Sequence, residues 1–262
     1  MIKNIIILLV LIIICNISFS QDVDKNKWGF SFAINNIDMM PGYGGGLTYT
    51  SDGSDGFLNG SGEKRNKSYS FSIIPKYYLS DDLILRFEVG FTNIDMTIHS
   101  DVMNVQHQLY TLEVKQTNYR YVPGIEWNLV RKKKIELFGG ILFSYIKYGN
   151  ITGADSSIAL DSATNVLLSW RSGKSIIPGG FSIGFGPVLR IQINLFKHFS
   201  IGAESSYSYI YSNVGGQTDN SYILSYNPSL PPQISSPHNF QENFKGFQFS
   251  KIKSSLNISI TF

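Results

Sequence analysis

The chain has 262 residues, of which 43% are hydrophobic and 14% are aromatic, and its formal net charge is +3. A net charge this small excludes the electrostatic footprint of a nucleic-acid-binding protein. The single cysteine excludes an internal disulfide framework, and after position 21 no apolar run reaches the roughly 18 residues that a transmembrane helix needs.

The first residues of the chain predict a secretory signal peptide. Lys3 supplies a short positive region, residues 5–14 are an unbroken apolar stretch, and Ser-Phe-Ser at 18–20 has the form of a small-x-small cleavage site. We therefore expect residues 1–20 to be removed and residues 21–262 to form a single domain.

Cys15 offers an alternative, a lipoprotein signal in which this cysteine carries the lipid. A lipobox normally has a small residue directly before the cysteine, and Ile14 stands there instead. Cleavage after Ser20 would remove the only cysteine, so the exported chain would have no thiol chemistry.

Eight later segments alternate apolar and polar residues with the period of a β-strand. They are 28–35, 68–79, 83–93, 117–129, 134–148, 178–195, 199–213 and 246–262, the last with a register slip near Lys251 that suggests a bulge. The connections alternate between short turns and long segments rich in Gly, Ser, Asn and Asp. The short turns are 80–82, 131–133 and 196–198, and the long segments are 36–67, 96–116, 149–177 and 214–245. This arrangement predicts an all-β fold, an eight-stranded antiparallel up-and-down barrel with four long loops at one end.

The two faces of these strands indicate a barrel that spans a membrane. One face is aromatic and aliphatic, with Tyr and Trp near both predicted strand ends, as in the two interfacial girdles of a membrane barrel. The other face carries charges of both signs: Lys76, Arg86, Glu88, Arg120, Glu126, Glu136, Arg190, Glu204 and Lys253. The interior of an eight-stranded barrel is just wide enough for side chains, so we expect these groups to pair there. A soluble calyx would instead turn its apolar face inward, around a ligand.

The chain ends on a strand whose apolar face comprises Leu256, Ile258, Ile260 and Phe262. This ending resembles the insertion signal of bacterial outer-membrane barrels. From residue 28 to residue 262 the chain resembles small outer-membrane barrels of the OmpA-transmembrane and OmpX type, and the "outer membrane protein beta-barrel domain" group of porin-family proteins. The resemblance implies a location in the outer membrane of a Gram-negative-type bacterium, contact with its lipids, and insertion by the barrel-assembly machinery. It also implies that the long loops face the exterior.

Two sets of residues could carry chemistry. The His-x-Ser letters at 198–200 resemble those of lipid A deacylases, but they fall on a short turn, on the opposite side of the membrane from lipid A. The other set lies in and next to the second long loop and comprises Asp95, His99, Asp101 and His107. We expect neither a metal nor another cofactor, because no third ligand with suitable spacing accompanies these histidines.

We therefore expect a non-enzymatic scaffold that displays its loops, since binding functions concentrate on loops held by a rigid framework. Surface binding, envelope integrity and membership of a secretion assembly are the roles that the resemblance implies, and a protein partner would bind through the loops. The alternatives are a lipid-modifying or proteolytic enzyme at the barrel rim and a narrow diffusion pore. The basic run 131–134 predicts a solvated turn that could touch anionic lipid headgroups.

Overall fold

The computed structural model describes residues 28–35, 63–103, 106–225, 233–235, 240–250 and 252–262, so the predicted signal peptide and Cys15 lie outside the described residues. The described chain is all-β, and every strand pairing in it is antiparallel, which confirms the all-β and antiparallel parts of the predicted fold. Its strands are β1 (Trp28–Asn35), β2 (Glu63–Asn66), β3 (Tyr69–Tyr78), β4 (Leu83–Met103), β5 (Gln106–Lys132), β6 (Ile135–Tyr148), β7 (Ile151–Asp161), β8 (Leu167–Ile177), β9 (Gly180–Phe196), β10 (Phe199–Ser206), β11 (Tyr209–Ser225), β12 (Gln233–Ser235), β13 (Phe240–Phe249) and β14 (Lys253–Thr261). Within the described ranges no helix is long and apolar enough to cross a bilayer.

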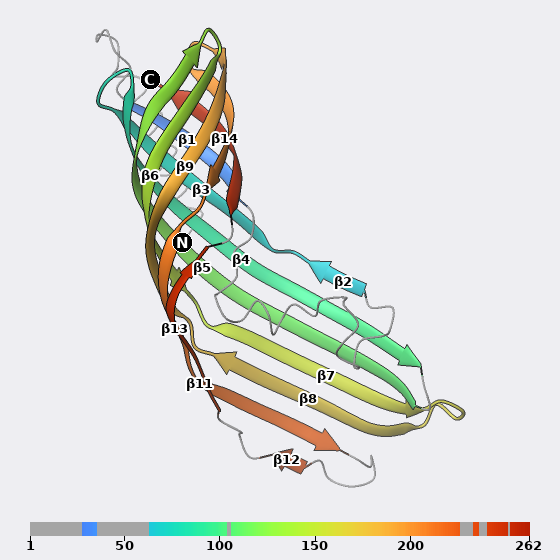
Figure 1. The fold of residues 1–262 in the computed structure, drawn as a ribbon. Helices are drawn as coiled ribbons and strands as arrows, with labels where there is room; N and C mark the ends of the chain where they lie inside the picture. Colours follow the sequence, from blue (N-terminus) through green and yellow to red (C-terminus); the bar gives the residue numbers. More distant parts are fainter. Residues whose placement is uncertain (1–27, 36–62, 104–105, 226–232, 236–239, 251) are drawn as a thin grey trace.

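Eight of these strands form a closed ring of hydrogen-bonded neighbours, in the upper part of Figure 1. The order is β1, β3, β4, β5, β6, β9, β10 and β14, and β14 pairs back onto β1. We call this set the strand ring. Short turns join β3 to β4, β5 to β6 and β9 to β10 at or beside the predicted places, although residues 131–132 belong to β5 and Phe196 belongs to β9. Lys133 lies in the middle turn with a φ of 42°.

Two predicted strands are interrupted. The segment 199–213 divides into β10 and β11, and the segment 246–262 divides into β13 and β14. The interruptions lie side by side, because Ser250 N donates to Ser208 O at 2.7 Å and Ser208 N donates to Ser250 Oγ at 2.9 Å. A break therefore falls where the sequence predicted a register slip, although Lys251 itself lies outside the described residues.

Beyond the ring, the sheet continues as an extended sheet made of β2, the distal parts of β4 and β5, β7, β8, the distal part of β11, and β12 (Figure 1). The β4–β5 pairing runs without interruption from Leu83↔Trp127 to Met103↔His107. The prediction of long loops was therefore wrong for most of 96–116, 149–177 and 214–245. Gly, Ser, Asn and Asp lower strand propensity, but a neighbouring strand here satisfies their backbone hydrogen bonds. Of the first predicted loop, 36–67, residues 36–62 lie outside the described residues.

Within the ring, side chains alternate between an exposed apolar outer face and a buried, largely polar inner face. On the outer face, Phe143 is 58% exposed and Leu189 is 51% exposed. On the inner face, Arg190 is 1% exposed and Glu126 is 0% exposed. A protein folded in water places its large apolar side chains inside and leaves unpaired charges outside, so the ring has the opposite arrangement.

Candidate functional site

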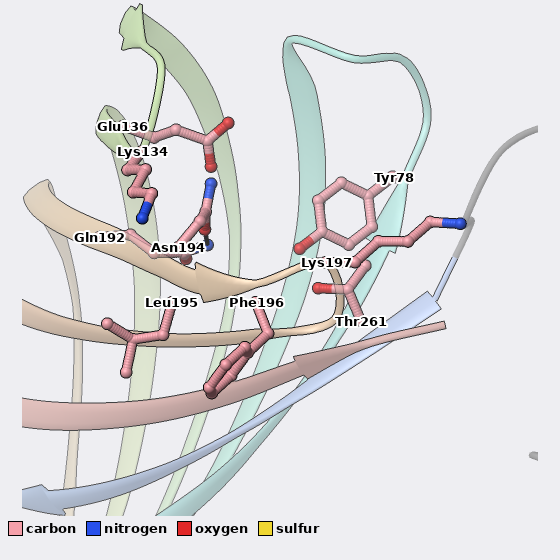
Figure 2. Close-up of a pocket in the computed structure, with 9 residues that line it drawn as sticks. All are labelled: Tyr78, Lys134, Glu136, Gln192, Asn194, Leu195, Phe196, Lys197 and Thr261. Atoms are coloured by element: carbon pink, nitrogen blue, oxygen red, sulfur yellow. Dashed lines mark hydrogen bonds between the residues drawn. The ribbon is translucent and has the colours of Figure 1, made fainter.

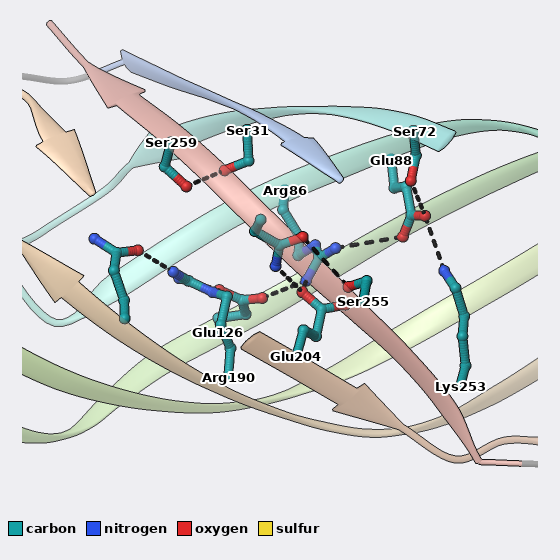
Figure 3. A network of polar contacts seen from close by, with 12 residues as sticks. Ser31, Ser72, Arg86, Glu88, Glu126, Arg190, Glu204, Lys253, Ser255 and Ser259 are labelled. Carbon is teal, nitrogen blue, oxygen red and sulfur yellow. Dashed lines mark hydrogen bonds and ion pairs between the residues drawn. The ribbon is translucent and has the colours of Figure 1, made fainter. Parts of the chain in front are cut away.

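The interior of the ring holds a cluster of buried charges centred on Glu126 of β5 (Figure 3). Arg86 Nη1 donates to Glu126 Oε1 at 2.5 Å, and Arg190 Nη2 donates to Glu126 Oε2 at 2.6 Å. Arg86 Nη1 also donates to Glu204 Oε2 at 2.7 Å. Since these residues come from β4, β5, β9 and β10, the cluster links strands on different sides of the ring.

Glu88 of β4 is the second centre of this cluster. It accepts hydrogen bonds from Arg86 Nη2 at 3.3 Å, from Lys253 Nζ at 3.0 Å and from Ser72 Oγ at 2.8 Å (Figure 3), and it also forms an ion pair with Arg120. Arg86 therefore contacts both centres. Buried carboxylates and guanidinium groups tolerate loss of water only when they are paired in this way.

Two of the nine predicted interior residues do not join these pairs. Lys76 lies directly opposite Arg86 in the β3–β4 pairing and is 1% exposed, yet its Nζ has no hydrogen-bond partner among the described residues. Glu136 lies nearer the turn end of the ring, where its Oε1 accepts from Arg131 Nε at 2.9 Å. The paired groups of the cluster thus comprise four cationic groups and three carboxylates, a formal excess of one positive charge.

Reasoning from charges alone missed several interior residues. The ring of Phe138, 2% exposed, lies 4.0 Å from the Arg190 guanidinium carbon and provides a cation–π contact. Gln192 accepts a hydrogen bond from Arg190, and Asn257 Nδ2 donates to Glu204 Oε2 at 3.5 Å. All three residues occupy inward positions of the alternation, which is the signal that could have identified them, and Phe138 stands directly opposite Arg190 in the β6–β9 pairing.

Apolar side chains fill the interior beside these charges. Val122, Leu142 and Val188 form one buried group. Gly124 makes room for it, because a Cβ on this glycine would collide with Leu142. A second apolar group, comprising Val114, Tyr148, Ile151 and Val214, lies where the ring joins the extended sheet. Among the described residues, buried charged and apolar side chains therefore occupy the ring interior from the charge cluster to the extended sheet.

The candidate catalytic residues of the second predicted loop lie on β4 and β5, near their shared hairpin. His107 Nε2 lies 2.7 Å from Asp101 Oδ1, and the Asp101 side chain is 54% exposed. His99 Nδ1 lies 3.0 Å from Thr111 Oγ1 instead, and Asp95 stands opposite Lys115. The structure thus brings one His–Asp pair together and leaves the other two residues apart from it.

The His-x-Ser letters at 198–200 are also separated. The Nδ1 atom of His198 lies 2.8 Å from the carbonyl oxygen of Thr261, whereas Ser200 is buried in the ring interior. No group of three or more His, Cys, Asp or Glu side chains that could hold a metal occurs in the described part of the chain.

The predicted insertion-signal residues end the strand that closes the ring. Leu256 and Ile258 lie on the outer face of β14 and are 66% and 47% exposed, whereas Ile260 and Phe262 are half-buried. β14 pairs with both β1 and β10, and Phe262 N donates to Trp28 O at 2.9 Å.

No protein-family model matches this chain, and no curated protein sequence matches it. Among solved structures, it is similar to the outer membrane protein OprG from Pseudomonas aeruginosa, with 10% identity and a TM-score of 0.38 over 91% of this chain and 97% of OprG. It is also similar to the outer membrane protease OmpT from Escherichia coli, with 8% identity and a TM-score of 0.32 over 90% of this chain and 94% of OmpT. CarO from Acinetobacter baumannii has 9% identity and a TM-score of 0.30 over 78% of this chain and 98% of CarO.

Proposed function

We propose that the strand ring is an eight-stranded outer-membrane β-barrel and that it carries the extended sheet as a non-enzymatic binding scaffold on the cell exterior. One observation supports this most directly. The outer face changes from apolar to polar at the same level on neighbouring strands, from Phe91 to Asn93 on β4 and from Tyr119 to Thr117 on β5, and these residues are paired in register.

The height of the apolar band fits a bilayer. On β5 the band runs over 119–129, the length of a transmembrane strand of about 9–11 residues. With a rise of about 3.3 Å per residue and a tilt of about 45°, it spans roughly 23 Å. Outer-membrane barrels have an apolar band of about 25 Å, so the ring is tall enough to span the membrane and the extended sheet would lie outside it.

Charged and apolar side chains occupy the interior of the ring, and this arrangement fits a structural support better than an open channel. Ion pairs tie together opposite sides of the ring, and such cross-links keep the base of the extended sheet rigid. The extended sheet then presents an outer face rich in polar groups, such as Asp95 and Lys115, to a partner. Surface binding, envelope integrity and membership of a secretion assembly are the roles that this geometry accommodates.

The membrane placement is tested by purification and gel electrophoresis. We expect the protein to need detergent for solubility and to migrate differently on gels before and after boiling. Solubility without detergent, with the same mobility in both states, would contradict the membrane placement.

The scaffold role is tested by removing the β7–β8 hairpin, residues 152–176, and joining its ends with a short turn. β7 and β8 take no part in the ring pairings, so the shortened protein should keep its heat-dependent mobility while losing the partner binding or surface phenotype of the full chain. A shortened protein with every phenotype intact would count against the scaffold.

The His107–Asp101 pair keeps one enzymatic alternative open, because a histidine held by a carboxylate can act as a general base. We expect His107→Ala, alone and with His99→Ala, to leave the lipid A profile of cells unchanged in mass spectrometry. A changed profile would favour a rim enzyme.

The diffusion-pore alternative is tested in planar bilayers. We expect no large, stable conductance from the inserted protein, because charged and apolar side chains fill the described interior. Stable single-channel openings would favour the pore.

A further inference from the structure

A hollow of about 480 Å³ opens at the turn end of the ring, away from the extended sheet (Figure 2). β6, β9, the ends of β3 and β14, and the turns beside them supply its lining, which comprises Tyr78, Lys134, Glu136, Gln192, Asn194, Leu195, Phe196, Lys197 and Thr261. This hollow is separate from the His107–Asp101 pair, which lies at the other end of β4 and β5.

The polar lining favours an anion. Lys134 reaches into the hollow beside Asn194 (Figure 2). Gln192 Nε2 donates to Asn194 Oδ1 at 3.0 Å, so the NH₂ group of Asn194 points the other way as a donor. The one carboxylate of the lining, that of Glu136, already accepts a hydrogen bond from Arg131.

The charges beneath the hollow add to this preference. Arg190 donates to Gln192, which connects the floor of the hollow to the buried charge cluster. The cluster has a formal excess of one positive charge. Lys76, which is fully buried, lies outside these pairs, and its Nζ has no hydrogen-bond partner among the described residues. A cluster with a net positive charge, linked to the floor of the hollow through Gln192, favours an anion over a cation there.

The apolar lining indicates which anion. Leu195 and Phe196 lie at the outer rim of the hollow and are 42% and 73% exposed. They continue the apolar outer face of β9, which includes Ile193. A phosphate in the hollow would therefore have a lipid-facing surface directly beside it.

We propose that this hollow binds the phosphate group of an anionic phospholipid, with Lys134 as its cationic partner and the acyl chains against Leu195 and Phe196. The inference rests on the proposed membrane placement, because only a membrane protein would have lipid at this rim. The protein would then have two functional sites, the extended sheet at one end of the ring and the phospholipid-binding hollow at the other.

The test measures lipid bound to the full mature chain in detergent, by native mass spectrometry, with phosphatidylglycerol or phosphatidylcholine added at equal concentration. We expect phosphatidylglycerol to be retained preferentially. Lys134→Gln should weaken this retention about fivefold, the equivalent of about 1 kcal/mol for one lysine near an anionic lipid surface. Lys132→Gln is the matched control, since Lys132 is exposed at the end of β5, next to the same turn, but does not line the hollow.

Equal losses in the two variants would indicate diffuse surface charge and would overturn the site, as would retention without preference for the anionic lipid. Inorganic phosphate is added in a further arm, and its binding in place of phosphatidylglycerol would assign the hollow to free phosphate and overturn the lipid ligand. Insertion into vesicles is measured on the same samples. Failure to insert would overturn the membrane placement as well, whereas insertion without lipid preference would overturn this inference alone.

Discussion

Replacing Glu126 with glutamine should weaken the ring more than any exposed charge substitution. The Glu126 carboxylate is fully buried and accepts hydrogen bonds from Arg86 and from two nitrogens of Arg190. Glutamine has nearly the same shape, but it removes the negative charge that balances these two guanidinium groups and replaces one acceptor oxygen with a donor.

The expected cost follows from the burial of all three side chains. Removing one partner of a buried ion pair typically costs about 3–5 kcal/mol, because the other charge remains buried without compensation. Since Glu126 serves two cations in an interior that already has an excess of positive charge, we expect about 4 kcal/mol. This equals roughly a thousandfold change in the unfolding equilibrium.

The assay is a urea titration of the protein in phospholipid vesicles, followed by tryptophan fluorescence and by the heat-dependent gel mobility. With a denaturant slope of about 2 kcal/mol per molar, the midpoint should fall by about 2 M. Glu136→Gln is the control. Its partner Arg131 has a side chain that is 46% exposed, so this substitution should cost less than about 1 kcal/mol.

Equal midpoints for Glu126→Gln and Glu136→Gln would refute the role of the buried cluster in stability. A second variant separates charge from shape. Glu126→Gln combined with Arg190→Gln removes one charge of each sign, so it should be less destabilised than the sum of the two single variants. Strict additivity would mean that the two side chains are not coupled.

Three further predictions use other parts of the molecule. Ile125→Lys, at the centre of the apolar band on β5, should destabilise the inserted protein by about 2–4 kcal/mol in the same urea titration. Its control, Ser172→Lys on the extended sheet, should cost less than about 0.5 kcal/mol. Equal costs for the two variants would argue against a lipid-facing band. Gly140→Val should destabilise by about 1–3 kcal/mol, because a Cβ at this position would collide with the backbone of β5, and an unchanged midpoint would show that the interior has spare room. At the tip between β7 and β8, hydrogen bonds from the Thr164 side chain and from neighbouring backbone amides hold the pKa of the Asp161 carboxyl below its ordinary value. This carboxylate therefore stabilises the turn above an unfolded pKa of about 4, and that contribution is lost as pH falls through the lower folded pKa. The Thr164 amide resonance should follow this titration by NMR in the wild type and not in Asp161→Asn, and a pH-independent wild type would contradict it.

Local pattern predicted the strands and short turns of the ring well. The predicted segments 83–93 and 117–129 lie within β4 and β5, the turn at 80–82 separates β3 from β4, and the turn predicted at 131–133 lies at 133–134. Alternation with period two and turn chemistry depend on residues close together in the chain, so they are visible without a structure.

The sequence wrongly predicted loops in the extended sheet because strand formation there does not depend on local pattern. Along 149–177 the apolar contrast between the two faces is weak, because both faces of the extended sheet carry many polar or small side chains. Strand formation there depends on a neighbouring strand, as in the pairing of Asp155 with Leu112 on one side and Gly173 on the other. No local pattern shows whether such a neighbour is present.

Composition and alternation by themselves determined that this chain forms antiparallel strands with an apolar face and a charged face. The reason is that the face on which a side chain lies follows from its position along the strand. Only the tertiary structure decided which charges meet. Arg86 and Glu204 are 118 positions apart and lie 2.7 Å from each other, whereas Lys76 is buried without a hydrogen-bond partner among the described residues and Glu136 lies near the rim. The physical reason is that the stagger between strands sets which side chains share a level in the ring, and the strand pairings fix that stagger over the whole chain.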